Sequence, residues 1–231
     1  MRDTLSAGLP ELGLDTALIP MLEQYARLLL ERNQVMNLTA ITEPKAVASL
    51  HLLDSLELIP LAKLHGGTLI DVGTGAGLPG LPLAAALPGL EVTLLDSLNK
   101  RIEFLRETSR ALSLQNVTCV HARAEEYAAD HREQFDWVVS RAVAALPVLA
   151  ELCLPLAKQG GYFLAMKSSH TGEEISRSER AIDLLGGRIM WVKDYQIPAA
   201  EVTHRLICIE KIKAAPKKYP RRFAQIKKAP L

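Results

Sequence analysis

Aromatic side chains are scarce in this chain: tryptophan, tyrosine and phenylalanine make up 5% of its 231 residues, whereas 48% of the residues are hydrophobic. This scarcity excludes a core of packed rings. A core of leucine, alanine, valine and isoleucine instead suits parallel strands that are covered by helices. The length allows one well-filled α/β domain with an appendage and is short for two full domains.

Cysteines are also few, and none forms a Cys-x-x-Cys pair. Cys119, Cys153 and Cys208 lie far apart in apolar surroundings. We expect them to be buried in a reducing compartment rather than to act as disulfide partners, metal ligands or nucleophiles. The first ten residues contain charge and proline but no apolar run, which excludes a signal peptide. A cytoplasmic protein is therefore expected.

Metal-ligand spacing is missing among the histidines, so no metal site is expected. We expect five of the six histidines to lie at the surface or in the ordinary core: His65, His121, His131, His170 and His204. The remaining one, His51, is three residues before Asp54 on an expected helix, so the two side chains share a face. This pair fits either a polar helix contact or the lining of a substrate pocket.

Charge-free runs of membrane-spanning length are missing, with one exception at residues 72–90. These 19 residues contain five glycines and three prolines. Such a composition disfavours a membrane span and predicts a strand-to-helix turn.

Acidic residues are absent from the end of the chain. Of the 27 lysines and arginines, eight lie in 211–231; the other 19 face all 26 acidic residues, which leaves the rest of the chain near −7. This asymmetry indicates an anionic partner or a solvated end, and the prolines in this stretch favour an extended tail. Tyr219 and Phe223 are candidates for stacking on nucleobases.

The hydrophobic pattern changes near residue 66. Before it, apolar residues recur at helical spacing in 15–33 and 46–59. After it, short strands alternate with helices. Strands are expected at 68–72, 91–95, 117–120, 135–140, 162–166, 188–192 and 206–212, and helices at 81–87, 99–112, 145–157 and 173–185.

This alternation predicts a Rossmann-like, doubly wound α/β sheet that is mostly parallel, with an antiparallel closing strand. The expected organisation is a helical N-terminal extension (1–64), a core (65–212) and a basic tail (213–231).

The glycine-rich stretch Asp71-Val72-Gly73-Thr74-Gly75-Ala76-Gly77-Leu78-Pro79-Gly80 falls between the first strand and its helix. Glycines there let a ligand approach the backbone, but the pattern fits both nicotinamide coenzymes and S-adenosylmethionine. Asp71 favours the latter, because a carboxylate attracts a cationic amino group and repels a pyrophosphate. Asp96, at the end of the second strand, fits either ribose. The simpler alternative for both acids is capping of a loop and of a helix.

The segment after the third expected strand flanks the adenine position in a doubly wound sheet. There, the backbone of Ala124 and the side chain of Glu125 are candidates for hydrogen bonds to the base edge.

Motifs outside the glycine loop are more specific. They are Asn37-Leu38-Thr39-Ala40-Ile41, His51-Leu52-Leu53-Asp54-Ser55, Asn99-Lys100-Arg101, Ser140-Arg141-Ala142, Met166-Lys167 and Tyr219-Pro220-Arg221-Arg222. With these motifs and the loop, nearly the whole chain resembles class I methyltransferases and, more narrowly, the family that methylates guanine N7 of bacterial 16S rRNA.

The resemblance implies S-adenosylmethionine as cofactor and 16S rRNA or the small ribosomal subunit as partner; we expect a monomer without membrane contact. The cofactor contacts that it implies are Gly73, Leu78, Ala124, Glu125 and Arg141, with Asp96 at the ribose, and the loop itself adds Asp71, Thr74 and Gly75. The candidate RNA-binding residues are Lys167, Arg221 and Arg222.

The residues after the fourth strand permit a chemical check. Ser140-Arg141-Ala142 carries neither the Asn/Asp-Pro-Pro-aromatic signature of amino-directed enzymes nor a nearby nucleophilic cysteine. Guanine N7 has an in-plane lone pair and no proton, so transfer there needs alignment rather than a general base. We expect Arg141, and as a second candidate His51, to position the reactants.

Three alternatives remain at this point. One is a methyltransferase of the same fold acting on another RNA, a protein or a small molecule. The others are an NAD-dependent oxidoreductase, disfavoured by Asp71, and a non-catalytic RNA-binding module.

Overall fold

A computed structural model describes residues 1–141 and 144–231; Ala142, the last residue of the Ser-Arg-Ala motif, lies outside the described part. Within that part, one seven-stranded sheet has the order β3-β2-β1-β4-β5-β7-β6. The strands are β1 (Gly67–Val72), β2 (Leu90–Asp96), β3 (Val117–His121), β4 (Phe135–Arg141), β5 (Ala157–Ser168), β6 (Gly187–Gln196) and β7 (Thr203–Lys211).

The strand directions confirm the predicted fold class. Strands β1 to β5 pair in parallel, and β7 is antiparallel to both β5 and β6. The carboxyl ends of five parallel strands therefore meet at one edge of the sheet, where ligands bind in doubly wound folds. Asp71, Asp96 and Arg141 all lie at or near this edge.

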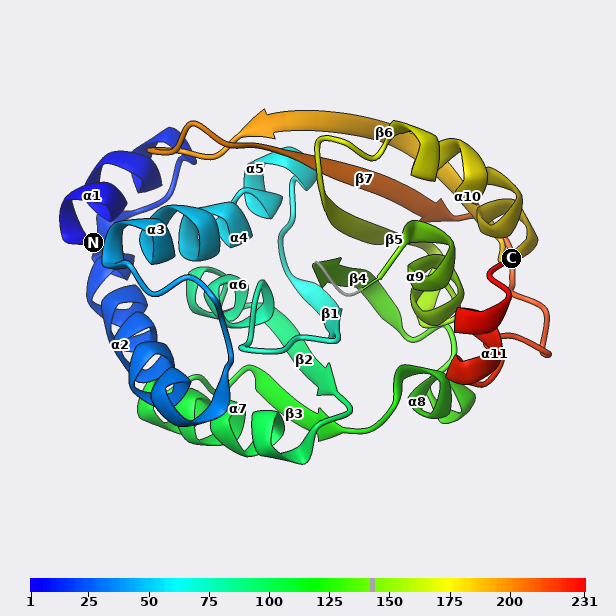
Figure 1. The fold of residues 1–231 in the computed structure, drawn as a ribbon, viewed down its shortest axis with the longest axis horizontal. Helices are drawn as coiled ribbons and strands as arrows, with labels where there is room; N and C mark the ends of the chain where they lie inside the picture. The colour runs from blue at the N-terminus through cyan, green and yellow to red at the C-terminus, as the bar shows by residue number, and fades with distance from the viewer. Residues whose placement is uncertain (142–143) are drawn as a thin grey trace.

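Helices cover both faces of the sheet (Figure 1). On one side lie α1 (Arg2–Glu11), the 3-10 turn η1 (Thr16–Leu18), α2 (Ile19–Met36), α3 (Pro44–Val47), the π-helical turn η2 (Ala48–Leu53), α4 (Asp54–Leu56), α5 (Leu58–Ala62), α6 (Gly80–Ala86) and α7 (Asn99–Ala111). On the other lie α8 (Ala124–Asp130), α9 (Leu146–Cys153), α10 (Gly172–Leu184) and α11 (Phe223–Lys228).

Two hydrophobic cores separate according to the strand alternation. Leu69 and Val139 belong to the core under the N-terminal helices, whereas Ile70 and Val138 belong to the core under α8 to α11. Successive side chains of a strand point to opposite faces, so each buried strand contributes to both cores. Because both faces of these strands are buried, their residues form near-continuous apolar runs in the sequence.

The helices of residues 1–64 provide one layer over the sheet. Leu5, Leu29 and Leu52 are fully buried and share a core with Leu94 of β2. Residues 1–64 therefore help to form the core on this face of the sheet. The domain boundaries 1–64, 65–212 and 213–231 remain predictions.

The expected single helix at 46–59 is wrong in detail. A π-turn interrupts it, since the backbone N–H of Asp54 donates to the carbonyl of Ser49, five residues earlier. Such wide turns are rare and recur at functional sites, because they redirect side chains from a helix surface.

The expected extended tail is also wrong. Residues 223–228 form helix α11, Ile226 is fully buried, and Tyr219 is only 7% exposed. Tyr219 is therefore unavailable for stacking on a base, and Phe223 is half-buried. The helices α1 and α8 were likewise not predicted.

No helix within the described residues is both long enough and apolar enough to cross a membrane. The charge-free stretch 72–90 contains the end of β1, the glycine loop and the seven residues of α6.

Candidate active site

Asp71 stabilises the glycine loop through hydrogen bonds. The carboxylate oxygen Oδ2 accepts hydrogen bonds from the hydroxyl of Thr74, at 2.7 Å, and the backbone N–H of Gly80, at 2.9 Å. The other oxygen, Oδ1, is buried and has no hydrogen-bond partner among the described residues. Burial raises the pKa of Asp71 to about 6, against the two hydrogen bonds, because the ionised form loses its hydration.

Glycine is required at two loop positions for different reasons. Gly75 has a φ of +60°, and a Cβ there would meet nothing nearer than the carbonyl oxygen of Gly73 at 3.9 Å, so the space beside it is open. A Cβ on Gly80 would lie 2.3 Å from Leu94. Gly75 thus leaves room for a ligand, and Gly80 permits helix α6 to pack on β2.

Asp96 is joined to the same loop from the end of β2. Its Oδ2 accepts from the backbone N–H of Gly75 at 3.0 Å and from the guanidinium of Arg101 at 3.2 Å, and its Oδ1 accepts from the N–H of Leu98. A carboxylate has about four acceptor sites. One site therefore remains for a hydroxyl while Arg101 stays in place.

The loop borders a cleft of about 390 Å³, which we call the glycine-loop cleft. Its wall consists of Leu38, Thr39, His51, Gly73, Thr74, Gly75, Ala76, Leu78, Asp96, Ser97, Arg101 and Arg141. The structure thus brings six of the expected cofactor residues to one cleft. Asp71 lies beneath the loop rather than in the wall, and Ala124 and Glu125 lie outside it.

Glu125 has an intramolecular partner that the sequence did not reveal. Its Oε1 accepts from the backbone N–H of Phe223 at 3.2 Å, so it holds the start of α11. Ala124 is the first residue of α8. Their roles at an adenine base remain predictions.

A buried tyrosine from α2 supports the loop from the other side. The hydroxyl of Tyr25 donates to the carbonyl of Ala76 at 2.8 Å, and the residue is 1% exposed. The sequence predicted only that Tyr25 lies within the helical segment 15–33; nothing in it indicated a partner for the hydroxyl.

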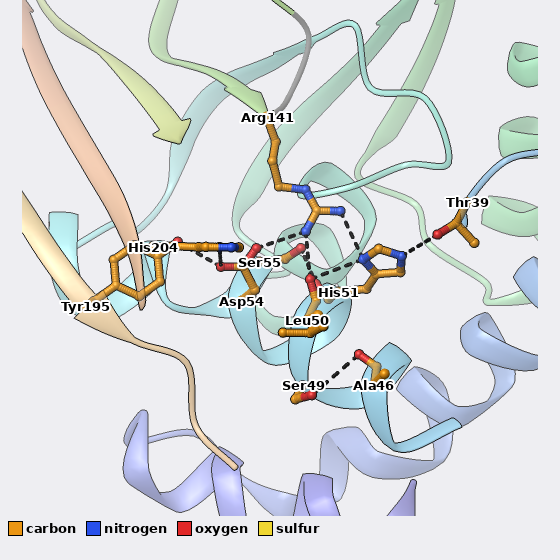
Figure 2. Close-up of polar contacts among 10 residues, drawn as sticks. All are labelled: Thr39, Ala46, Ser49, Leu50, His51, Asp54, Ser55, Arg141, Tyr195 and His204. Atoms are coloured by element: carbon orange, nitrogen blue, oxygen red, sulfur yellow. Dashed lines mark hydrogen bonds and ion pairs between the residues drawn. The ribbon is translucent and has the colours of Figure 1, made fainter. Parts of the chain in front are cut away.

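Arg141 is the centre of a polar cluster that links distant segments (Figure 2). Its Nη1 donates to Asp54 Oδ2 at 3.0 Å and to the carbonyl of Leu50 at 3.2 Å, and its Nη2 lies 3.5 Å from Nδ1 of His51. Asp54 is fully buried. His51 and Asp54 therefore do share a face, and both are directed at Arg141.

Asp54 has two further donors that sequence analysis missed. Its Oδ1 accepts from the Tyr195 hydroxyl at 2.8 Å and from His204 Nδ1 at 2.9 Å (Figure 2). Burial alone would raise the pKa of Asp54, but the hydrogen bond from His204 and the charge of Arg141 hold it below its usual value. His204 was expected at the surface or in the ordinary core; the sequence did not reveal that β7 brings it to a carboxylate 150 positions away.

His51 is held as a neutral ring. Its Nε2 lies 2.7 Å from the hydroxyl of Thr39, and the residue is 8% exposed. Burial and the nearby Arg141 lower the pKa of His51 to about 4. At neutral pH this side chain can accept or donate a hydrogen bond without adding positive charge to the site.

Arg141 and His51 also border a second, larger cavity of about 730 Å³, which we call the β5 cavity. Its other lining residues include Met166, Lys167 and Glu174. The two side chains common to both walls separate the glycine-loop cleft from the β5 cavity. The two spaces therefore adjoin at Arg141 and His51.

The three candidate RNA-binding residues differ in their surroundings. Lys167 pairs with Glu174 at 2.7 Å and donates to the carbonyl of Ala144. Arg221 pairs with the fully buried Glu151 at 2.6 Å. Both therefore have intramolecular partners for their charge, which is a structural alternative to phosphate binding, whereas Arg222 is exposed.

The residues of the glycine-loop cleft fit the sulfonium cofactor expected from the sequence. Gly75 leaves space for it, Asp96 has a free acceptor site, and the unpartnered oxygen of Asp71 places negative charge beneath the loop. A pyrophosphate would be repelled by the carboxylate of Asp71, whereas Asp96 suits the ribose of either cofactor. Among the described residues, no group of three or more His, Cys, Asp or Glu side chains is arranged to hold a metal ion.

Comparisons with solved structures support the fold. A SAM-dependent O-methyltransferase from Thermotoga maritima aligns with a TM-score of 0.55 and 15% identity, over 81% of this chain and 73% of that one. TYW2 from M. jannaschii, solved with AdoMet, aligns with a TM-score of 0.51 and 17% identity, over 64% of this chain and 70% of that one. At these identities the likeness concerns the architecture alone.

Sequence comparisons are more specific. The Ribosomal RNA small subunit methyltransferase G of Alkaliphilus metalliredigens is 50% identical over 98% of this chain and 97% of its own length. The protein of that name from Lachnoclostridium phytofermentans is 49% identical over 100% of this chain and 98% of its own length. The family model described as rRNA small subunit methyltransferase G matches residues 18–203, which include the glycine loop and the Arg141 cluster up to Tyr195. The chain therefore belongs to the rRNA small subunit methyltransferase G family.

Proposed function

We propose that this protein transfers the methyl group of S-adenosylmethionine to N7 of a guanine in the 16S rRNA of the small ribosomal subunit. The observation that carries the proposal is the pair of adjoining spaces that share Arg141 and His51. The glycine-loop cleft takes the cofactor, and the β5 cavity takes the target base. Family membership supports rRNA as the substrate.

The chemistry requires alignment and a site that tolerates new positive charge on the base. When bound, S-adenosylmethionine supplies an electrophilic methyl group on a sulfonium sulfur. The N7 lone pair forms the bond to the methyl carbon as the sulfur–carbon bond breaks, so the positive charge moves from sulfur to the purine. No proton leaves N7, and therefore no general base is needed.

The polar cluster suits this charge transfer. Asp54 neutralises the guanidinium of Arg141 through their 3.0 Å contact, and the lowered pKa of His51 keeps its imidazole neutral. Neither side chain then repels a purine that becomes cationic. Both can still fix the positions of the reactants through hydrogen bonds.

The proposal is tested by incubating the protein with labelled S-adenosylmethionine and three acceptors: naked 16S rRNA, small subunits and lysate proteins. Nucleoside analysis of the product should yield 7-methylguanosine from one position of the rRNA. Label in protein, in a small molecule or at another atom of the base would replace the proposal with a different methyltransferase activity.

Asp71→Asn should weaken binding of S-adenosylhomocysteine about tenfold, or about 1.4 kcal/mol. Asparagine can still accept the hydrogen bonds from Thr74 and Gly80, but it removes the buried charge that favours the cationic amino group. Calorimetric titration measures the effect, and Asp130→Asn, at an exposed position, is the control.

The pH dependence of this binding has a definite sign. Because the pKa of Asp71 is about 6 and only the ionised form attracts a cation, wild-type affinity should fall as pH decreases through 6. The Asp71→Asn variant should lack this step. Equal affinity of both proteins at pH 7.5 would reduce Asp71 to a support for the loop.

The C-terminal segment is proposed to hold rRNA phosphates through its exposed basic side chains, which are those of Lys217, Lys218, Arg222, Lys227 and Lys228. With about four contacts, log affinity against log salt should have a slope near −3. Arg222→Met should make that slope shallower by about 0.7–0.9 without changing thermal stability. A slope that Arg222→Met and Lys227→Met leave unchanged would remove this segment from RNA binding.

A further inference from the structure

The β5 cavity contains an ion pair that the transfer chemistry does not use. Lys167, at the end of β5, and Glu174, in the first turn of α10, lie 2.7 Å apart and both line the cavity. Their side chains are 11% and 21% exposed, so both are largely withdrawn from solvent. A salt bridge at the surface contributes little to stability. A pair withdrawn from solvent loses its hydration, so both side chains need further hydrogen bonds.

The hydrogen bonds of this pair leave one donor and one acceptor unused. Lys167 has three N–H groups; one donates to the carbonyl of Ala144, and the ammonium group forms an ion pair with Glu174 Oε1 at 2.7 Å. Glu174 Oε1 also accepts from the backbone N–H of Leu146. Within the described residues, Oε2 of Glu174 accepts no hydrogen bond. Among the described residues, each member of the pair thus keeps one hydrogen-bonding group without a protein partner, and both side chains line the β5 cavity.

This arrangement matches one edge of guanine. Guanine presents the acceptor O6 beside the donor N1–H, and its 2-amino group follows as a second donor. Adenine presents the reverse order, a 6-amino donor beside the acceptor N1. A lysine N–H facing O6 and a carboxylate facing N1–H would therefore accept guanine and reject adenine, because adenine would leave both charged groups unpaired.

The placement also leaves N7 free. In guanine, N7 lies on the opposite side of O6 from N1. When the O6/N1 edge is held at Lys167 and Glu174, N7 makes no contact with this pair and remains free to accept the methyl group. Arg141 and His51 also line this cavity and border the glycine-loop cleft.

A phosphate group is a poorer occupant of this position. Lys167 alone would attract it, but the carboxylate of Glu174, 2.7 Å from the ammonium group, would repel it. The pair is neutral overall and offers a dipole rather than a net charge, which suits a neutral base edge.

We propose that Lys167 and Glu174 are the specificity-determining pair that binds the O6/N1 edge of the target guanine. This inference rests on the proposed function, since it assigns the base that is methylated to the β5 cavity. It makes the RNA contact expected for Lys167 a contact to the base.

The test uses small-subunit rRNA ligated to carry guanine, inosine or 2-aminopurine at the methylated position, once that position has been mapped. Inosine lacks only the 2-amino group, whereas 2-aminopurine lacks both O6 and N1–H but retains N7. With the wild-type enzyme, the KM should rise a few-fold for inosine and about tenfold or more for 2-aminopurine.

The variants are Glu174→Gln and Lys167→Met, and Glu173→Gln is the matched control because Glu173 is exposed and pairs with Arg177, on its own helix. Glutamine can still accept from the N–H of Leu146, so Glu174→Gln preserves that contact to α9. Both variants should lose about tenfold in kcat/KM with guanine and show little further loss with 2-aminopurine. Affinity for S-adenosylhomocysteine should be unchanged.

Each result has one meaning. A purely structural role of the pair would lower turnover for all three bases by the same factor, and that outcome would overturn the inference. If the wild-type enzyme yields no 7-methylguanosine, the proposed function fails before the base series is made. If it does, and the variants retain wild-type discrimination between guanine and 2-aminopurine, only the base-reading pair is wrong.

Discussion

Arg141→Ala should lower kcat/KM for methyl transfer to rRNA by about a hundredfold or more. The guanidinium lies at the boundary between the two cavities, where it contacts Asp54, the Leu50 carbonyl and His51. Without it, His51 and the segment around η2 lose the contact that fixes them relative to the end of β4. A displacement of about 1 Å between reacting groups costs on the order of a hundredfold in rate.

The variant must be separated from a simple loss of stability. Among the described residues, Arg141→Ala leaves the side chain of the fully buried Asp54 with Tyr195 and His204 as its remaining donors, and an under-compensated buried carboxylate is costly. The double variant Arg141→Ala/Asp54→Asn removes that charge and should recover thermal stability. If it also recovers turnover, Arg141 acts only as a structural partner of Asp54.

Arg141→Lys provides the complementary control. Lysine retains the charge but cannot present two donors in a fixed plane. We therefore expect it to keep the protein folded and to lose most of the activity. Wild-type turnover of Arg141→Ala at low cofactor concentration would contradict a positioning role of this residue altogether.

Arg221→Met should destabilise the protein by about 3–5 kcal/mol, the range observed when one partner of a buried ion pair is removed. Glu151, in α9, is fully buried, and both of its oxygens are bound to Arg221. Its Oε1 also accepts from the backbone N–H of Arg221 at 2.9 Å. The melting temperature should fall by about 10 °C, since 1 kcal/mol shifts it by about 2–4 °C in a chain of this size.

Two further variants identify the cause of this loss. The double change Glu151→Leu/Arg221→Met removes both charges and should recover most of the stability. Arg222→Met, at the adjacent exposed position, should melt as the wild type does. If Arg221→Met also melts as the wild type does, the C-terminal segment is not anchored through Glu151, and Arg221 is available for RNA.

The strands and the glycine loop could be predicted from the sequence because their signals are local. Runs of β-branched and aliphatic residues of strand length, separated by helical periodicity, are sufficient to place β1 to β5 within a few residues. The loop after β1 was equally clear, since Gly75 needs a positive φ and Gly80 a close approach to Leu94. The position of Asp96 beside this loop follows from the parallel order of β1 and β2.

The elements that were missed depend on distant partners. Helix α11 forms where the sequence indicated an extended tail, because Ile226 and the Glu151–Arg221 pair bind it to the second core. The π-turn η2 has no strong local signal, and its geometry is stabilised by burial of Leu52 and Leu53. Propensity in a short window contains no information on these contacts.

The sequence by itself determined the alternating layers, the nucleoside-binding loop and the family, because periodicity, glycine positions and motif order are properties of neighbouring residues. Only the tertiary structure decided what the charged groups do. It buried Asp71 beneath the loop, brought Tyr195 and His204 to Asp54 across 141 and 150 positions, and paired Lys167 with Glu174. A carboxylate or an ammonium group acts on whatever lies within a few ångströms, and the folding of the sheet sets those distances.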